Sequence, residues 1–126
     1  MEIINRSEVA PFITKDGSTI REILAYRNSD IKNQSLAEAI VPPGITTTAH
    51  YHPKTEEIYY ILSGEGIIRV GEFEKNVGPG DAIPIAPGTP HQIRNTAESD
   101  LVILCCCSPA YEHEDTILID SLLDTK

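Results

Sequence analysis

The chain has 126 residues and a mass of 13.8 kDa, which is enough for one domain with its own hydrophobic core and too short for two. Hydrophobic residues make up 40% of the sequence and charged residues 23%, a balance that excludes a disordered chain. Nineteen acidic residues against ten basic ones give a formal charge of -9, so phosphate backbones and anionic membranes would repel the protein, and nucleic acid and membrane partners are not expected.

Glycine and proline recur along the sequence and divide it into short segments with the composition of β-strands. Helix is expected at most around residues 6–12 and in the last dozen residues. About eight short strands in one domain predict an all-β fold, either a sandwich, a jelly roll or a closed barrel. In chain order, the predicted strands are Thr19–Tyr26, Leu36–Val41, Thr46–His52, Ile58–Leu62, Gly66–Val70, Ala82–Ile85, Gln92–Arg94 and Leu101–Cys107.

Two of these predicted strands, residues 58–62 and 101–107, are apolar on both faces. A strand with one face in water should alternate between apolar and polar residues. We therefore expect one face to line the interior of the fold and the other to pack on a second sheet or on another subunit, because a large exposed apolar patch is unusual on a monomer. The hypothesis that follows is a homodimer formed through sheet faces.

The start of the chain and its cysteines indicate the compartment. The first residues, MEIINRSEVA, show no basic segment followed by an apolar one, so no secretory signal is expected. The longest apolar run has seven residues, against about 20 needed to span a bilayer. Cys105, Cys106 and Cys107 are consecutive and cannot build a disulfide framework, and they are expected to pack as small hydrophobic residues, with a redox or metal role as the alternative. A cytoplasmic protein is predicted.

The candidate site begins with two of the four histidines. His50 and His52 are two residues apart on a predicted strand, so their imidazoles project from the same face, as do Thr46 and Thr48, and both can bind one ion. Pro53 then interrupts the strand, after which Glu56 or Glu57 can point back at the ion. Strand parity alone leaves the choice between these two glutamates open.

His91 follows a turn rich in proline and glycine, residues 86–90. Such a turn restricts the backbone and aims the side chain that follows it. His91 is therefore a candidate third ligand for the same ion.

The segments around these histidines and glutamates resemble the two motifs of the cupin superfamily. The first cupin motif is a glycine, five residues, His-x-His, three or four residues, a glutamate, six residues and a glycine, which here matches Gly44, His50, His52, Glu57 and Gly64. The second motif is matched over residues 80–95 by Gly80, Gly88, His91 and Asn95, with Ala86 where the motif has its first proline. The resemblance implies a single cupin β-barrel, a double-stranded β-helix jelly roll with little helix, over residues 1–126.

In metal-binding cupins, the residues at the positions of His50, His52, Glu57 and His91 are the ligands, and the resemblance favours Glu57 over Glu56. Three imidazoles and one carboxylate suit a divalent transition metal, Fe, Mn, Ni, Zn, Co or Cu, better than Ca or Mg. Four protein ligands on an octahedral ion would leave two positions for water, an oxyanion, or substrate plus dioxygen. The alternative is a cupin that has lost the metal and keeps the histidines as a hydrogen-bonded interior.

Further candidates each have a functional and a structural interpretation. Tyr59 shares strand parity with Glu57 and is a candidate pocket residue, or an aromatic that fills the barrel. Thr48 is either a neighbour that supports the histidines or a good strand former. Arg21 would reach an anionic substrate or lie solvated on the surface. His113 is expected in an exposed terminal segment, with a second metal site as the alternative.

The cupin resemblance implies oxygenases, isomerases, decarboxylases and lyases alongside binding proteins, and the fold alone does not choose among them. Our first hypothesis is a metalloenzyme that chelates a small oxygen-rich or carbonyl substrate, as an iron-dependent oxygenase or a sugar or sugar-phosphate isomerase. The second is a non-catalytic small-molecule binding or sensing module, and the third an interaction domain. The sequence shows no Ser-His-Asp pattern, phosphate-binding glycine loop or dinucleotide fingerprint, so covalent acyl transfer and nucleotide-dependent chemistry are not supported.

Overall fold

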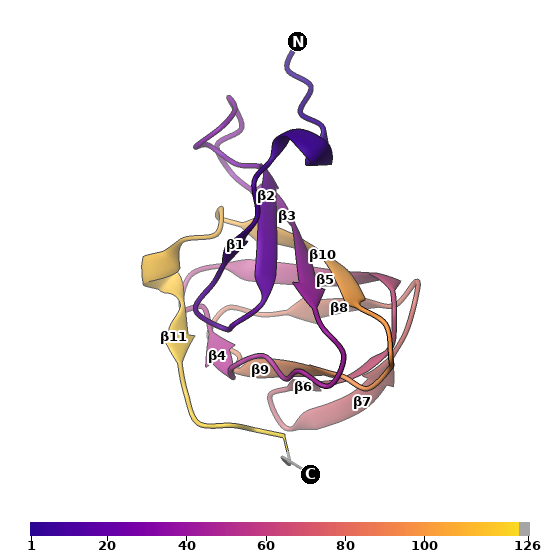
Figure 1. The fold of residues 1–126 in the computed structure, drawn as a ribbon. Coiled ribbons are helices and arrows are strands. Elements are labelled where there is room, and N and C mark those ends of the chain that lie inside the picture. The colour runs from indigo at the N-terminus through magenta and orange to yellow at the C-terminus, as the bar shows by residue number, and fades with distance from the viewer. Residues whose placement is uncertain (124–126) are drawn as a thin grey trace.

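The computed structural model describes residues 1–123 and consists almost entirely of β-strands (Figure 1). Within these residues helix is limited to two single turns of 3-10 helix, Arg6–Glu8 and His113–Asp115. The strands are β1 (Phe12–Ile13), β2 (Thr19–Leu24), β3 (Ser35–Val41), β4 (His50–Tyr51), β5 (Glu56–Ser63), β6 (Gly66–Val70), β7 (Phe73–Val77), β8 (Ala82–Ile85), β9 (His91–Asn95), β10 (Leu101–Ser108) and β11 (Ile117–Leu118). The all-β prediction is confirmed, and a single domain over residues 1–126 stays a prediction.

The strands form two antiparallel sheets that pack face to face. The six-stranded sheet has the order β1-β2-β3-β10-β5-β8, and the five-stranded sheet has the order β11-β4-β9-β6-β7. Alternate residues of β5 and β10 are buried, as expected for strands with one face against a core. The core between the sheets is apolar, and its most deeply buried members are Val41, Ile61, Ile85, Ile93, Leu101 and Ile103.

The predicted strands 66–70 and 82–85 have the observed bounds, but the predicted strand over residues 46–52 is wrong. Only β4 forms there, with an isolated bridge between Thr46 and Arg94. The Thr47 hydroxyl accepts a hydrogen bond from the backbone N–H of Ile93 at 3.1 Å. In a regular pair of strands, a backbone carbonyl oxygen would accept this hydrogen bond. Because the strand is interrupted here, Thr48 is exposed instead of sharing the buried face of the histidines.

Three observed strands were not predicted, namely β1, β7 and β11. The sequence of β7, FEKNV, lacks apolar alternation because the strand is an edge strand and its first four residues are exposed. In the described part of the last dozen residues, 115–123, the helix that was considered does not form: the segment begins at the end of a 3-10 turn and continues into β11, which pairs with β4. Residues 124–126 lie outside the described range.

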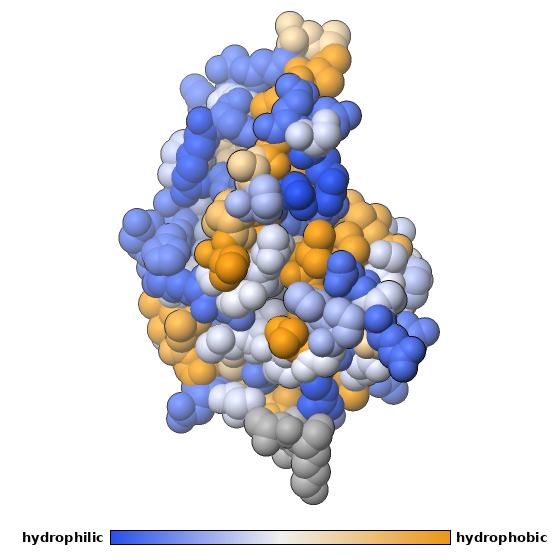
Figure 2. All heavy atoms as spheres, viewed as in Figure 1, coloured by the Kyte–Doolittle hydropathy of each residue, from blue (hydrophilic) through white to orange (hydrophobic). Residues whose placement is uncertain are grey.

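The outer face of β5 is apolar and exposed in the single chain. Ile58, Tyr60 and Leu62 are 47%, 41% and 44% exposed, so the second sheet covers only the inner face of this strand. A smaller exposed apolar pair, Ile117 and Leu118, lies on β11, where hydrophobic side chains gather in Figure 2. None of the described helical turns is long and apolar enough to cross a membrane.

Two residues of the motifs have structural roles that the backbone explains. Gly64 has a φ of 88°, and a side chain there would place Cβ 2.6 Å from the carbonyl oxygen of Asp100. Asn95 is buried, and its amide group donates to the carbonyl oxygens of Val41 and Ser99 at 2.9 and 2.7 Å. Both residues therefore hold the connection into β10 and do not belong to the candidate site.

Candidate metal centre

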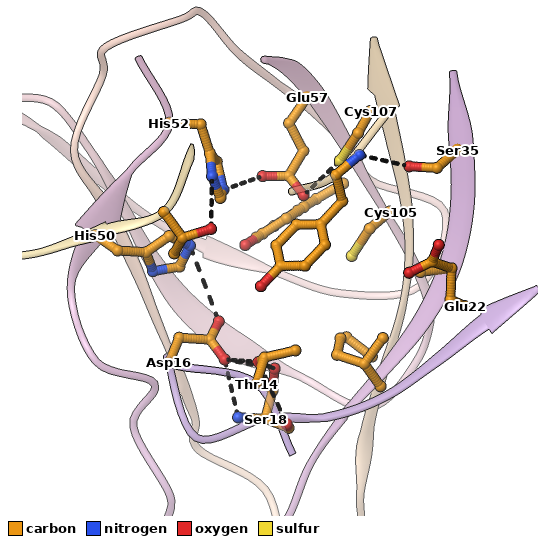
Figure 3. Close-up of a pocket in the computed structure, with 16 residues that line it drawn as sticks. Thr14, Asp16, Ser18, Glu22, Ser35, His50, His52, Glu57, Cys105 and Cys107 are labelled. Carbon is orange, nitrogen blue, oxygen red and sulfur yellow. Dashed lines mark hydrogen bonds and ion pairs between the residues drawn. The ribbon is translucent and has the colours of Figure 1, made fainter. Parts of the chain in front are cut away.

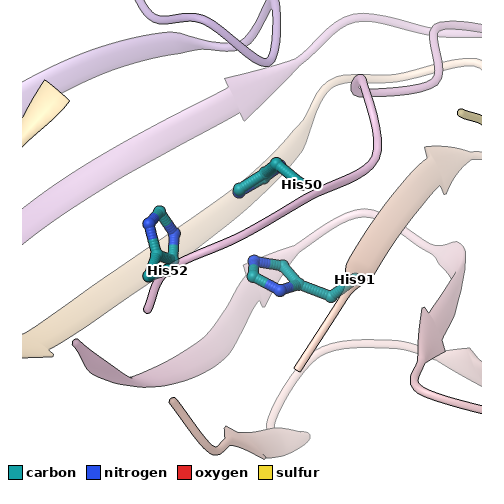
Figure 4. A group of neighbouring side chains, drawn as sticks. All are labelled: His50, His52 and His91. Carbon is teal, nitrogen blue, oxygen red and sulfur yellow. The ribbon is translucent and has the colours of Figure 1, made fainter. Parts of the chain in front are cut away.

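Three histidines meet inside the barrel: His50 and His91 lie on adjacent strands of the five-stranded sheet, and His52 lies just after β4 (Figure 4). His50 of β4 and His91 of β9 are cross-strand partners with ring centroids 4.3 Å apart. His52 follows two residues after His50, and its ring centroid lies 5.0 Å from that of His50 and 5.5 Å from that of His91. All three side chains are buried, and one nitrogen of each ring lies within 4.8 Å of the other two.

The backbone fixes the same tautomer in all three rings. The Nδ1 atoms of His50, His52 and His91 lie 2.8, 3.1 and 3.0 Å from the carbonyl oxygens of Thr48, Asp115 and Thr89. A carbonyl oxygen only accepts, so each Nδ1 carries the proton and donates it. In the neutral ring each Nε2 therefore keeps a lone pair, which is the form of imidazole that binds a metal.

Glu57 enters the same space from the opposite sheet. Its Oε1 atom lies 3.4 Å from Nε2 of His52 and 3.5 Å from Nε2 of His91. Glu57 is 5% exposed and shares the inner face of β5 with Tyr59 and Ile61, whereas Glu56 is exposed. Of the two glutamates that parity left open, the structure therefore brings Glu57 to the histidines.

Two buried atoms at this point have no hydrogen-bond partner among the described residues, Oε1 of Glu57 and Nε2 of His91. An unsatisfied buried polar atom costs about 1–3 kcal/mol, and such atoms are few in folded proteins. A divalent cation between the imidazoles and the carboxylate would satisfy both atoms, and a donor set of three nitrogens and one oxygen suits a transition metal. The residues present therefore fit the metal that the sequence implies.

Burial and mutual contacts set the charge of these groups. Burial alone would raise the pKa of Glu57, but the contacts with His52 and His91 outweigh it and lower the pKa to about 2. Burial, followed by the charge of His91, lowers the pKa of His50. Burial also lowers the pKa of His52, yet Glu57 outweighs it, so the net shift is upward. At neutral pH the site thus holds the carboxylate of Glu57 beside the imidazoles, and His50 resists protonation.

Residues outside the predicted set hold the histidines in place. The backbone N–H of Gly88, in the turn before His91, donates to the carbonyl oxygen of His52 at 2.7 Å and so joins the two motifs. The buried carboxylate of Asp115 accepts the backbone N–H groups of Lys54 and Thr55 at 3.1 to 3.2 Å, while its own carbonyl oxygen accepts from His52. Asp115 lies far from His52 in the sequence and was missed, because no local pattern marks it.

A cavity opens from the histidines between the two sheets (Figure 3). Among the predicted pocket residues, Tyr59 lines this cavity, with its ring centroid 5.7 Å from that of His91. Thr48 lies outside the cavity, although its carbonyl oxygen orients His50, and Arg21 lies on β2 at 3.6 Å from Glu38. Among residues 1–123, no lysine or arginine lines the wall. Its polar and ionisable members are Thr14, Asp16, Ser18, Glu22, Ser35, His50, His52, Glu57, Tyr59, Cys105, Cys107, Tyr111 and Thr116.

The cysteines divide between the two faces of β10. Cys105 and Cys107 are buried and line the cavity, whereas Cys106 is half-buried on the other face. The thiol of Cys107 donates to Oε2 of Glu57 at 3.3 Å. Burial, followed by the charge of Glu57, raises the pKa of both inward thiols, so they are neutral at ordinary pH. Both thiols thus line the cavity as neutral groups, and that of Cys107 also contacts Glu57. The remaining histidine, His113, is exposed and lies outside the cluster of His50, His52 and His91.

Comparison with known proteins places this architecture in a family. The sequence model of the cupin domain matches residues 37–107. A curated relative, an uncharacterized protein of Methanocaldococcus jannaschii, is 49% identical over 113 residues that cover 90% of each chain. An oxalate-binding protein of Thermotoga maritima is 36% identical over 73 residues, 58% of this chain and 60% of that protein.

Among solved structures, the polyketide cyclase RemF of Streptomyces resistomycificus superposes with a TM-score of 0.80 at 23% identity, covering 99% of this chain and 89% of that one. At this identity the likeness shows the fold alone. The family match covers more than half of the sequence and contains both histidine motifs completely. The chain therefore belongs to the cupin family.

Proposed function

We propose that this cupin holds one divalent transition metal through His50, His52, Glu57 and His91, and that it binds a small oxygen-rich or carbonyl ligand there. The observation that carries the proposal is the buried triad of imidazoles whose Nδ1 atoms are all committed to backbone carbonyls. Fe, Mn, Ni, Zn, Co and Cu are the candidate ions, because they accept imidazole nitrogen readily. When bound, such an ion supplies Lewis acidity that polarises an oxygen of the ligand.

The chain's own residues would shape and orient the ligand. Tyr59 and Cys105 form an inner wall and stay neutral, since burial raises the pKa of each. Tyr111 and Thr116, from the segment around the second 3-10 turn, close the side of the cavity next to His52. Neutral side chains on this part of the wall keep water from the charged centre and so strengthen electrostatic interactions with a bound ligand. The relative that binds oxalate supports a small oxygen-rich ligand in a cupin of this type.

Within this proposal we favour a metalloenzyme, either an iron-dependent oxygenase or a sugar or sugar-phosphate isomerase. The second candidate is a binding or sensing module. It is favoured by the raised pKa values of Tyr59, Cys105 and Cys107, which leave no titrating acid or base among these three cavity residues near neutral pH.

Turnover by metal-loaded protein separates these candidates. Protein stripped with a chelator is reloaded in turn with Fe(II), Mn(II) and Zn(II) and incubated with hydroxyketones and sugar phosphates. We expect uptake of one ion per chain and turnover with at least one ion: oxygen consumption with Fe(II) marks the oxygenase, and oxygen-independent conversion with Mn(II) or Zn(II) marks the isomerase. Ligand binding without turnover establishes the binding module, and failure of every ion to bind refutes the proposal.

We further propose that two copies associate through the outer face of β5, where Ile58, Tyr60 and Leu62 are exposed. Light scattering should give twice the chain mass of 13.8 kDa at micromolar concentration. Tyr60→Glu should give a monomer, because a carboxylate would be buried without a partner at the contact. The matched control is Phe73→Glu, at an exposed aromatic on β7, which should stay dimeric. A monomeric wild type, or a dimeric Tyr60→Glu variant, would contradict this assembly.

A further inference from the structure

Asp16 is an acidic cavity residue that neither cupin motif contains. It lies in the turn between β1 and β2 and faces His50 across the cavity (Figure 3). Its Oδ1 atom accepts three hydrogen bonds, from the Thr14 hydroxyl at 2.7 Å, the Ser18 hydroxyl at 2.6 Å and the Ser18 backbone N–H at 2.9 Å. The orientation of the carboxylate is therefore fixed from one side.

The second oxygen, Oδ2, is directed at the histidine cluster. It lies 3.9 Å from Nε2 of His50, which is too far for a hydrogen bond. The turn that carries it is held against the barrel, because the backbone N–H of Thr48 donates to the Asp16 carbonyl oxygen at 2.7 Å and Lys15 donates to the Thr116 carbonyl oxygen at 3.1 Å. Oδ2 is thus an acceptor held in place next to one of the proposed ligands.

The charge of the cavity limits what it can receive. In the described part of the chain no lysine or arginine lines it, and the nearby ammonium of Lys15 is bonded to the carbonyl oxygen of Thr116. Glu22 also lines the cavity, but it is paired with Arg27 at 2.7 Å. A divalent ion at the histidines would be balanced by the carboxylates of Glu57 and Asp16. Because these two carboxylates already offset the charge of the ion, a dianionic ligand would add two negative charges next to Asp16, and no lysine or arginine of the described wall would compensate them. This is unfavourable where solvent is excluded.

We propose that Asp16 sets ligand selectivity: Oδ2 accepts a hydrogen bond from the hydroxyl of a small neutral hydroxycarbonyl ligand and disfavours dicarboxylates and other dianions, so neutral sugars are favoured over sugar phosphates as ligands. The inference rests on the proposed function, because the metal at the histidines holds the oxygens of the ligand. It sets this cavity apart from one that takes oxalate, the ligand named for the Thermotoga maritima relative. Asp16 acts on the ligand directly and leaves the protein's own metal ligands unchanged.

Ligand titration of cobalt-loaded protein tests this role without relying on activity. Cobalt(II) has a visible spectrum that responds to its ligands, so dissociation constants for dihydroxyacetone and for oxalate can be measured on each variant. Wild type should prefer dihydroxyacetone. Asp16→Asn should weaken the binding of dihydroxyacetone by about 10- to 100-fold, which is the value of one hydrogen bond to a charged group. The same substitution should strengthen the binding of oxalate. The matched control is Asp30→Asn, the same change at an exposed position, which should leave both constants unchanged.

Three results would overturn the selectivity role: tighter binding of oxalate than of dihydroxyacetone by wild type, an unchanged ratio of the two constants in Asp16→Asn, or loss of cobalt from that variant, which would make Asp16 a metal ligand. If wild type binds cobalt and the selectivity of Asp16→Asn is unchanged, only the role of Asp16 is refuted. Failure of wild type to bind cobalt removes the proposed metal function as well, so the two failures are distinguishable.

Discussion

Replacing His50 or His91 with alanine is expected to lower the affinity for a divalent metal by more than about 100-fold, since loss of residues that merely orient ligands already costs about 10- to 100-fold. The two rings are cross-strand partners with centroids 4.3 Å apart, so each variant removes one corner of the triad. Metal affinity is measured by competition with a chromophoric chelator on metal-free protein.

The exposed His113 provides the control, because His113→Ala removes an imidazole that lies outside the cluster and should bind metal like wild type. Circular dichroism on each variant establishes that the barrel is folded, which matters because His91 is 1% exposed. Unchanged metal affinity in folded His50→Ala and His91→Ala would show that these imidazoles are a hydrogen-bonded interior and not ligands.

Glu57→Gln is expected to weaken metal binding and to destabilise the metal-free protein, whereas Glu56→Gln should do neither. The two variants make the same chemical change at neighbouring positions, one inside the barrel and one exposed. Glu57→Gln keeps the shape of the side chain but removes the negative charge beside His52 and His91. Metal affinity and urea unfolding of both variants give the comparison. Equal effects of the two substitutions would contradict the assignment of Glu57.

The destabilisation by Glu57→Gln should depend on pH. The pKa of Glu57 is lowered from 4.5 to about 2, so its carboxylate stabilises the folded protein above pH 4.5 by on the order of 3 kcal/mol, and this contribution is lost as pH falls through about 2. The raised pKa of His52 has the opposite sign: its contribution is complete below 6.5 and is lost as pH rises through the raised value. The difference between wild type and Glu57→Gln should therefore be largest between about pH 4.5 and 6.5. A difference that grows towards pH 2 would contradict the assigned charges.

Local sequence patterns predicted the part of the site that local geometry determines. Spacing of two residues brought His50 and His52 together, and the rigid turn before His91 placed the third imidazole, which the pairing of β4 and β9 then brings to the first. The choice of Glu57 needed the resemblance to cupins, because the alternation of side chains along β5 does not show which of its two faces is turned inward. In the structure, the face that carries Tyr59 and Ile61 is buried.

The residues that the sequence did not reveal reach the site through tertiary contacts. Asp16 comes from the hairpin between β1 and β2, and Asp115 from the segment before β11, and neither strand pair was predicted. Arg21 was considered for the pocket, yet its guanidinium lies beside Glu38 and not in the cavity, because the residue type alone does not show which face of β2 is turned inward. Thr48 was placed on the buried face by assuming a regular strand, which the Thr47 hydroxyl interrupts.

If His50, His52, Glu57 and His91 together bind one transition metal, the ion should be visible in crystals of the untagged protein by anomalous diffraction recorded on both sides of the absorption edge of the candidate ion. We expect one anomalous peak per chain, within bonding distance of the three Nε2 atoms and of a Glu57 oxygen. No peak at this position after soaking with Fe(II), Mn(II), Co(II), Ni(II), Cu(II) and Zn(II), or a peak bonded to other residues, would contradict it.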